Sequence, residues 1–307
     1  MATGIPTNRS NLPLPNAVSS EILQKTQESS AVMQLARKIP LPGQGVQIPV
    51  ITSDPVASWV TETGTKPVSN PGLNKKVMQA HKLAVIIPFS DEFKRDMGQL
   101  YNALVERLPN ALGLEFDKTV FFGPASTLAN FDDFSEVTAQ SLSGTGGVYG
   151  GLVAADTDIS EQGGMISGYV FSPQGRGMLL NALDKQNRPI FINNVSEGSV
   201  PKILGASTYF RKVAYKEGTA GTGSGSGAGT PDIVGFAGDW SHAMWGTVEG
   251  IKISFADQAS LTVQKGTSYE TINLFQQNMF AVRAEIEVGF VAETAYFNAL
   301  TRTHAAS

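Results

Sequence analysis

The sequence predicts an α+β fold, and two patterns indicate it. Between residues 90 and 123 apolar side chains recur every three or four positions, as they do on one face of an amphipathic helix. Residues 46–61, 77–89 and 279–291 instead alternate between apolar and polar side chains, which is typical of strands with one buried face. A long helix beside several alternating strands, with no internal repeat, places the chain in the α+β class.

The long helix is the clearest element. Ser90 can accept a hydrogen bond from the first turn, and Asp91 and Glu92 suit the positive end of a helix. Pro109 predicts a kink because proline removes one backbone hydrogen bond. The pair at 123–124, Gly and then Pro, predicts the end of the helix. The apolar face begins with Phe93, Met97, Leu100, Tyr101, Leu104, Val105 and Leu108.

Two early strands are expected to form a long arm. Residues 46–61 and 77–89 are predicted to pair, with residues 62–76 as their mobile tip, because that stretch holds two prolines and two glycines. An isolated two-stranded hairpin is only marginally stable in water. We therefore expect the arm to rest on another part of the structure.

The remaining elements follow from local signals. The late strand over 279–291 should bury one face and expose Arg283, Glu285 and Glu287 on the other. A weakly helical segment is expected at 21–38, and residues 217–231 should form a flexible loop because they are almost entirely Gly, Ser, Thr and Ala. Further helices are expected at 152–162 and 173–185, and further strands at 168–172, 191–194, 203–215, 233–238, 244–248 and 251–255.

The composition points towards subunit contacts. Charged residues make up 16% of the 307 residues, against about 25% in an average soluble protein. The buried centres of interfaces are poor in charge, so much of this surface could face other subunits. A Ser-, Thr- and Gly-rich extracellular protein would explain the same number. Residues 1–90 carry 8 basic and 4 acidic residues, which fits either a segment lying on acidic neighbours or a solvated arm.

The residues give little support for catalysis or ligand binding. There are no cysteines, and the three histidines, His81, His242 and His304, are far apart in sequence. No glycine-rich stretch carries the lysine that a phosphate-binding loop needs, and no nucleophile elbow occurs. The acidic pairs at 132–133 and at 156 and 158 fit turns better than a cation site. We expect no catalytic residue, no metal and no cofactor.

Two further classes of partner are not expected. The formal net charge of −4 does not favour a protein that binds nucleic acid by bulk electrostatics. No run of 18 apolar residues predicts a membrane span, and residues 1–15 show no apolar signal segment.

Several stretches together resemble a known family. The most specific is Trp59-Val-Thr-Glu62 followed by VMQAHKLAVIIPFSDEFKRD at 77–96. FAVRAEIEVGFVAETAYFNAL at 280–300 and SPQGRGMLLNALDKQNRPIF at 172–191 add to it, and the pattern covers nearly all of residues 40–300. In this order the segments resemble the major capsid proteins of tailed bacteriophages, which share the Hong Kong 97-like fold.

The resemblance implies a domain plan. It makes residues 1–40 an N-terminal arm, 41–89 an extended two-stranded loop, and 90–139 with 261–290 a peripheral domain built on the spine helix 90–123. Residues 140–260 would be an axial domain, and whether 291–307 rejoins it stays open.

The function implied is structural rather than enzymatic. The chain would self-assemble into the hexamers and pentamers of an icosahedral shell around double-stranded DNA, which it would touch weakly and non-specifically. Its further partners would be scaffold, portal and decoration proteins, and its place the virion, after assembly in the bacterial cytoplasm. The residues expected at contacts between subunits are Trp59, Glu62, Lys66, Lys75, Lys76, Lys82 and Arg283.

Covalent crosslinking occurs in some relatives, between a loop lysine and an asparagine near a glutamate. Asn298 and Glu293 are the nearest candidates here, but they do not match the crosslinking motif, so we do not expect that chemistry.

Two other functions stay open from the sequence. A bacterial compartment shell protein of the same fold, enclosing enzyme cargo, would have the same elements. A secreted β-rich binding or adhesive module would explain the low charge and the glycines, but it leaves the helix at 90–123 unexplained.

Overall fold

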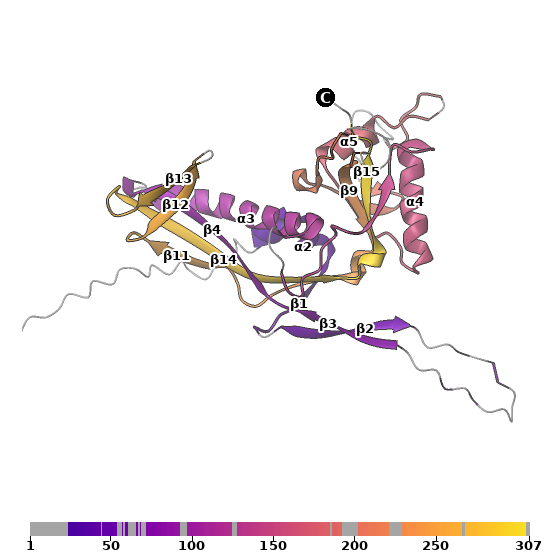
Figure 1. Cartoon of the computed structure of the whole chain (residues 1–307), viewed down its shortest axis with the longest axis horizontal. Helices are drawn as coiled ribbons and strands as arrows, with labels where there is room; N and C mark the ends of the chain where they lie inside the picture. Colours follow the sequence, from indigo (N-terminus) through magenta and orange to yellow (C-terminus); the bar gives the residue numbers. More distant parts are fainter. Residues whose placement is uncertain are drawn as a thin grey trace, which may run out of the picture.

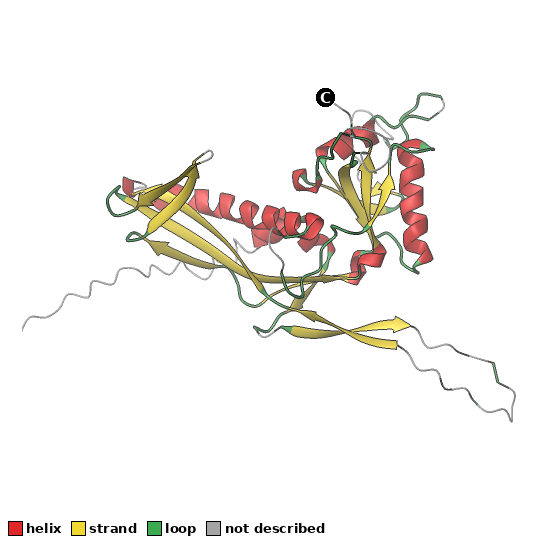
Figure 2. Cartoon of the chain, in the orientation of Figure 1, coloured by secondary structure: helices red, strands yellow, loops and turns green. Residues whose placement is uncertain are grey.

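The α+β prediction is confirmed by the computed structural model, in which two lobes join at one end of a long strand and a two-stranded hairpin projects away from both (Figure 1). Each of the two lobes contains both helices and strands (Figure 2). The described residues are 24–43, 45–53, 57, 59–60, 66, 68, 72–92, 97–124, 128–184, 186–191, 202–220, 229–265 and 268–304.

The first lobe, here called the α3 lobe, is a sheet backed by one helix. Its central strand is β14 (Met279–Ala292), and β4 (His81–Ser90) pairs antiparallel along one edge of it. Val288 pairs with both His81 and Thr247, so β10 (Ala243–Thr247) lies on the edge opposite β4. β11 (Lys252–Ala256) continues along that edge, and β1 (Arg37–Pro40) pairs parallel with β10. A small hairpin of β12 (Ser260–Lys265) and β13 (Ser268–Asn273) completes the lobe.

Helix α3 (Met97–Phe122) covers one face of this sheet. Leu108 and Leu112 of the helix lie fully buried against the sheet. The predicted alternation along β14 is confirmed over residues 282–288, where Arg283 is exposed between fully buried neighbours, whereas residues 288–292 are all buried because both faces of the strand are covered there. The helix is continuous through Pro109 and ends at Gly123, whose φ of +80° is the left-handed conformation that glycine adopts easily. The inward face of β14 consists of Val282, Ala284, Ile286 and Val288.

The second lobe, here called the α4 lobe, contains a six-stranded sheet in the order β5-β15-β9-β6-β8-β7. Its strands are β5 (Thr138–Ser141), β6 (Gly168–Phe171), β7 (Lys202–Ile203), β8 (Ala206–Phe210), β9 (Asp232–Gly238) and β15 (Phe297–Arg302). Helices α4 (Gly147–Glu161) and α5 (Pro173–Leu180) pack on it. The helix expected at 173–185 begins at Pro173 as predicted but ends at Leu180, and the side chain of Ser172, which was not predicted as a cap, accepts from the N–H of Gly175.

An aromatic core joins the two lobes. Phe121 of α3 stacks on Phe236 of β9 with ring centroids 4.7 Å apart. Phe134, in the connection between α3 and β5, stacks on Phe297 of β15 at 4.4 Å and lies edge-on to Phe290 of β14. These rings come from both sheets and belong to one buried cluster, so the lobes share a core.

The N-terminal part of the described chain is not a free arm. Residues 24–29 are helical, and α2 (Ala31–Leu35) follows with Val32 fully buried. A Cβ at Gly113 of α3 would lie 2.3 Å from the Oγ of Ser29, so glycine permits this close approach. β1 then joins the sheet of the α3 lobe. The arm predicted over 1–40 is therefore wrong for residues 24–40; residues 1–23 lie outside the described residues.

A buried carboxylate fixes this segment to α3. Asp117 accepts hydrogen bonds from the hydroxyl of Ser30 and from the backbone N–H groups of Ala31, at 2.8 Å, and Val32, at 3.3 Å. Ser30 also caps α2 through its bond with the N–H of Met33. Burial raises the pKa of Asp117 to about 6, although these hydrogen bonds act to lower it.

This carboxylate predicts a specific pH dependence. The folded chain holds the proton of Asp117 more tightly than the unfolded chain does, so its stabilising effect is complete below the ordinary value of 3.8 and is lost as the pH rises through about 6. Relative to Asp117→Asn, the free energy of unfolding of the wild type should fall by about 2 kcal/mol between pH 4 and pH 7. Denaturant unfolding of both unassembled chains across that range measures it. Parallel pH profiles for the two chains would contradict the assignment.

The structure corrects the predicted pairing of the arm. The hairpin consists of β2 (Val46–Ser53) and β3 (Gly72–Met78), so residues 72–76 are strand rather than tip. The stretch predicted as one strand, 77–89, divides at residues 79–80, and its larger part is β4 in the sheet of the α3 lobe.

The predicted domain boundaries also move. β10 and β11 lie in the sheet of the α3 lobe rather than with 140–260, and β5, which spans the expected boundary between 139 and 140, lies in the sheet of the α4 lobe. β15 lies in the same sheet, so residues 297–302 rejoin that lobe, which the sequence left open. Helix α4 begins at Gly147, earlier than the helix expected at 152–162. The β12–β13 hairpin was not predicted, and the strand expected at 191–194 falls almost entirely outside the described residues.

Candidate functional site

The hairpin carries the exposed apolar side chains expected of a subunit contact. β2 and β3 pair antiparallel from Val46 opposite Met78 to Ser53 opposite Gly72. Beyond the strands, Trp59 is 106% exposed and Val68 is 87% exposed, so neither side chain packs on its own chain. Lys66 is exposed as well, and Glu62 lies outside the described residues. Large apolar groups held in water away from any core indicate a surface that binds another molecule.

The root of the hairpin is fixed firmly to the body. Met78, at the end of β3, is fully buried beside Leu41 and Val291. Lys76, two residues earlier on β3, places its Nζ 2.9 Å from Oδ2 of Asp132 and donates to the carbonyl oxygen of Ala292 at 2.6 Å. This lysine was expected at a contact between subunits, but its charge is paired within its own subunit.

Two other predicted contact residues also have partners within the chain. Lys82 lies 3.4 Å from Glu287, directly across from it on the sheet. Arg283 contacts Glu285 at 3.1 Å and donates to the hydroxyl of Ser254 at 3.2 Å. Both cations lie on the face of the sheet opposite α3 and stay half-exposed or more, so an ion pair there contributes little to folding. Lys75 is exposed on β3 beside Lys76.

The crosslinking chemistry finds no support at Asn298. This residue is fully buried in β15, where its amide nitrogen donates to the carbonyl oxygen of Ala155 at 3.3 Å. A lysine from another subunit cannot reach an amide in that position without opening the α4 lobe.

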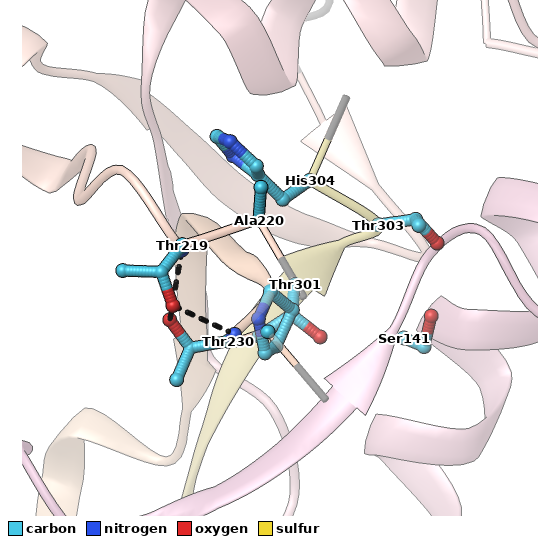
Figure 3. Close-up of a pocket in the computed structure, with 9 residues that line it drawn as sticks. Ser141, Thr219, Ala220, Thr230, Thr301, Thr303 and His304 are labelled. Carbon is cyan, nitrogen blue, oxygen red and sulfur yellow. Dashed lines mark hydrogen bonds between the residues drawn. The ribbon is translucent and has the colours of Figure 1, made fainter. Parts of the chain in front are cut away.

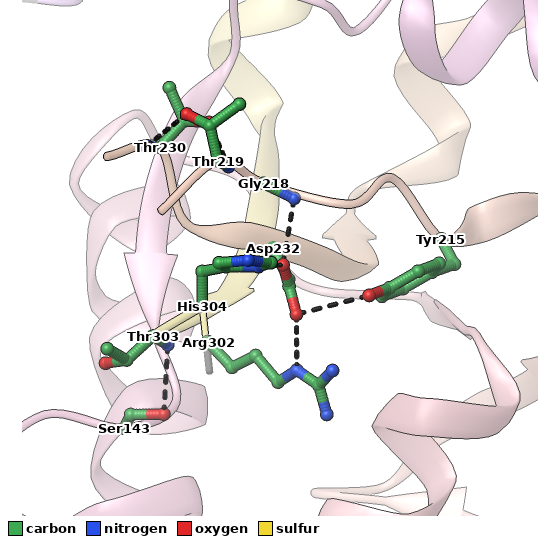
Figure 4. Close-up of polar contacts among 9 residues, drawn as sticks. All are labelled: Ser143, Tyr215, Gly218, Thr219, Thr230, Asp232, Arg302, Thr303 and His304. Carbon is green, nitrogen blue, oxygen red and sulfur yellow. Dashed lines mark hydrogen bonds and ion pairs between the residues drawn. The ribbon is translucent and has the colours of Figure 1, made fainter. Parts of the chain in front are cut away.

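A buried carboxylate organises the far end of the α4 lobe (Figure 4). Asp232, whose side chain is 1% exposed, accepts from Nε of Arg302 at 2.8 Å and lies 2.6 Å from Nδ1 of His304. It also accepts from the N–H of Gly218 at 2.8 Å and from the hydroxyl of Tyr215 at 3.2 Å. Burial alone would raise the pKa of Asp232, but the hydrogen bonds from Gly218, His304 and Arg302 outweigh it and hold the pKa well below its usual range.

A pocket of about 350 Å³ is lined in part by His304, the hydrogen-bond partner of this carboxylate (Figure 3). Thr219 and Thr230 close one side of it, where each backbone N–H donates to the hydroxyl of the other residue. These bonds hold the two ends of the predicted flexible loop together; residues 221–228 lie outside the described residues. The other lining residues are Ser141, Ala220, Gly229, Pro231, Thr301, Thr303 and His304.

Asp232 and His304 form a hydrogen-bonded pair within the α4 lobe. Among the described residues, the hydrogen bond shown for the imidazole of His304 is the one to Asp232. No cluster of three or more potential metal ligands occurs among the described residues, and none of the described helices could cross a membrane.

Comparison with known proteins identifies the family. The model of the phage capsid family matches residues 11–300. The chain belongs to the phage capsid family. This capsid chain is 27% identical over 282 residues to the "Probable major capsid protein gp17" of Mycobacterium phage L5, covering 89% of this chain and 83% of the relative. It is 23% identical to the "Major capsid protein" of Staphylococcus phage 80alpha, covering 90% and 80%.

Solved structures share the fold of this capsid chain. A chain of Microbacterium phage Oxtober96 aligns with a TM-score of 0.66 at 22% identity, covering 89% of this chain and 91% of that one. The capsid of an empty GTA particle aligns with a TM-score of 0.63 at 11% identity, covering 99% and 95%. The Hong Kong 97-like fold predicted from the sequence is thereby confirmed, and the family is a structural one rather than a class of enzymes.

Sequence reasoning missed the residues that anchor the capsid hairpin. Asp132 was interpreted as a turn carboxylate, and Lys76 as a contact to another subunit. The two lie 56 positions apart in the chain, and no local pattern links them. Gly289, which allows β14 to approach the hairpin root closely, was not singled out either.

Proposed function

We propose that this chain is the major capsid subunit of a tailed bacteriophage, which self-assembles into the hexamers and pentamers of an icosahedral shell enclosing double-stranded DNA. The observation that carries the proposal is the hairpin, which projects from the body with Trp59 and Val68 fully open to water while its root is anchored in the subunit core. Such a hairpin gains its stabilisation by lying on a neighbouring subunit.

Each part of the subunit then has a place in the shell. The α3 lobe acts as the peripheral domain and the α4 lobe as the axial domain around the centre of each capsomer. The shared aromatic core makes the two lobes one stiff unit. Differences in conformation between subunits of hexamers and subunits of pentamers are therefore expected in the hairpin and in the segments that do not pack on the lobes.

The contact residues proposed on this hairpin are Trp59, Glu62, Lys66 and Lys75. Lys82 and Arg283 can reach a neighbour from the open face of the sheet, where their ion pairs are exposed enough to exchange partners. Burying a large apolar side chain such as Trp59 contributes about 1.5–3 kcal/mol, so the apolar residues dominate this contact and the charges set its register.

The remaining partners are proposed from the same role. Scaffold, portal and decoration proteins would assemble with this subunit in the bacterial cytoplasm, and the mature location is the virion. The formal net charge of −4 fits only weak, non-specific contact with packaged DNA.

Sedimentation of the purified full-length chain tests the proposal. We expect capsomers and shells that sediment far ahead of a 32.6-kDa monomer, and closed particles in electron micrographs. Particles from infected cells should contain DNA, which the ratio of absorbance at 260 nm to that at 280 nm reports. A monomer at high protein concentration would refute assembly, whereas closed shells filled with protein cargo would favour the bacterial compartment instead.

A further inference from the structure

The hairpin leaves the body where β4 stops pairing with β14. β4 pairs with residues 279–288, and β3 turns away from the next residues of β14. A Cβ at Gly289 would lie 2.5 Å from the carbonyl oxygen of Gln79 and 2.8 Å from Cγ of Met78. The root of the hairpin therefore lies directly against this part of β14, with Met78 buried beneath it.

Lys76 and Asp132 fasten the root at a second point. Lys76 and Met78 are two residues apart on β3, so both side chains point towards the body. The Nζ of Lys76 bonds Asp132 at 2.9 Å and the carbonyl oxygen of Ala292 at 2.6 Å, while the same oxygen of Asp132 accepts from the N–H of Ala292 at 3.0 Å. The side chains of Lys76 and Asp132 are 34% and 32% exposed, which shields them partly from solvent.

A small change of angle at the root of the hairpin produces a large displacement at its outer end. A strand rises about 3.3 Å per residue, so the seven residues of β3 extend about 23 Å, and a tilt of 10° at the root would move the outer end by about 4 Å. Burial of Met78 alone keeps the hairpin root on β14, but it does not fix the angle at which the hairpin leaves, because hydrophobic contact is non-directional. The hydrogen bonds of Lys76 to a carboxylate and a carbonyl have preferred angles, so they fix the angle of the hairpin.

We propose that Lys76 and Asp132 are positioning residues that set the angle at which the hairpin leaves the subunit, and thereby the curvature of the shell that neighbouring subunits form. This inference rests on the proposed capsid function. It assigns to Lys76 a role inside its own subunit, in place of the contact between subunits that the sequence suggested.

Distances within the unassembled full-length chain test the angle directly. The chain has no cysteine, so Ser53→Cys at the outer end of β2 and Lys118→Cys on α3 give the only two sites for spin labels. Double electron–electron resonance spectroscopy should then give a narrow distribution of distances between the two labels. Lys76→Ala should broaden it or move its mean by about 4 Å, as expected for a tilted strand. Lys76→Arg, which can donate to both oxygens, should restore it.

Lys252→Ala is the matched control. It removes a lysine of the same lobe whose exposed ion pair with Glu249 is remote from the hairpin, and it should leave the distance distribution unchanged. Melting temperatures distinguish a change of angle from loss of the fold. Lys76→Ala should melt close to the wild type, because the root of the hairpin still packs on β14 through Met78 and Gly289.

Assembly gives the second measurement. Electron micrographs of Lys76→Ala should show about tenfold fewer closed, uniform particles and more open or irregular ones, because a small weakening is repeated at every subunit contact of the shell. An unchanged distance distribution for Lys76→Ala would overturn the proposal even if its shells were defective. If the wild type formed no shells, the capsid proposal would fail, while the distance measurement would still decide whether Lys76 sets the angle.

Discussion

Replacing residues 54–71 with a two-residue turn is expected to abolish closed shells and leave the subunit folded. β2 ends at Ser53 and β3 begins at Gly72, so the deletion keeps both strands and the anchored root. It removes Trp59, Val60 and Val68, and each large apolar side chain buried on a neighbour contributes about 1.5–3 kcal/mol. A loss of several kcal/mol weakens each contact more than about a hundredfold, and because every subunit of a shell makes this contact, closed particles should be lost.

Circular dichroism, melting curves and counts of particles in negative stain measure the two effects separately. The control replaces residues 221–228 with two glycines, because Thr219 and Thr230 already hold the ends of that loop together. That variant should assemble normally. Normal shells from the 54–71 deletion would refute the role of the hairpin end, and an unfolded deletion protein would mean that this end belongs to the core.

Asp232→Ala should destabilise the folded subunit strongly, and far more than Lys76→Ala. The change leaves Arg302, His304 and the N–H of Gly218 without their shared acceptor inside the α4 lobe. Removing one partner of a buried ion pair costs about 3–5 kcal/mol. Denaturant unfolding of the unassembled chain measures this loss. Asp184→Ala is the control, because Asp184 makes the same kinds of bond with Arg188 in an exposed turn, and its loss should be much smaller.

The same carboxylate predicts behaviour in acid. Because the pKa of Asp232 is held below its usual value in the folded chain, its contribution is complete above that value and is lost as the pH falls towards the folded pKa. Unfolding of the wild type should therefore become easier below about pH 4, and Asp232→Ala should lack this dependence. The effect is opposite in sign to that of Asp117, which favours the folded chain at acid pH. A wild type and Asp232→Ala that lose stability equally in acid would refute the assignment.

Local periodicity was enough to predict the elements that bury one face along their whole length. The face of α3 that carries Leu108 and Leu112 and the inward face of β14 both follow from residue spacing alone, since each element packs on a single layer. The break between β3 and β4 could not be recognised from the alternation of apolar and polar residues. Met78 is buried in β3 and Leu83 is packed in β4, at opposite parity, but Val77 and Met78 are both apolar, so the sequence shows no break.

The anchored parts of the chain depend on partners far away in sequence. β1 covers the end of an expected weak helix and the first of two prolines, and only its pairing with β10, more than 200 positions later, makes it an edge strand of the sheet in the α3 lobe. Asp117 and Asp132 each look like ordinary helix or turn carboxylates until the fold brings them to Ser30 and Lys76. Trp59 was expected at a contact between subunits; the structure leaves its side chain exposed, and the contact itself stays a prediction.

A cryo-electron microscopy reconstruction of assembled particles, at a resolution that traces side chains, tests the central claim most directly. We expect the β2–β3 hairpin of each subunit to lie on a neighbouring subunit with Trp59 buried there, while Lys76 remains bonded to Asp132 of its own chain. A closed shell in which Trp59 stays in solvent, or in which the hairpin folds back onto its own subunit, would contradict the claim.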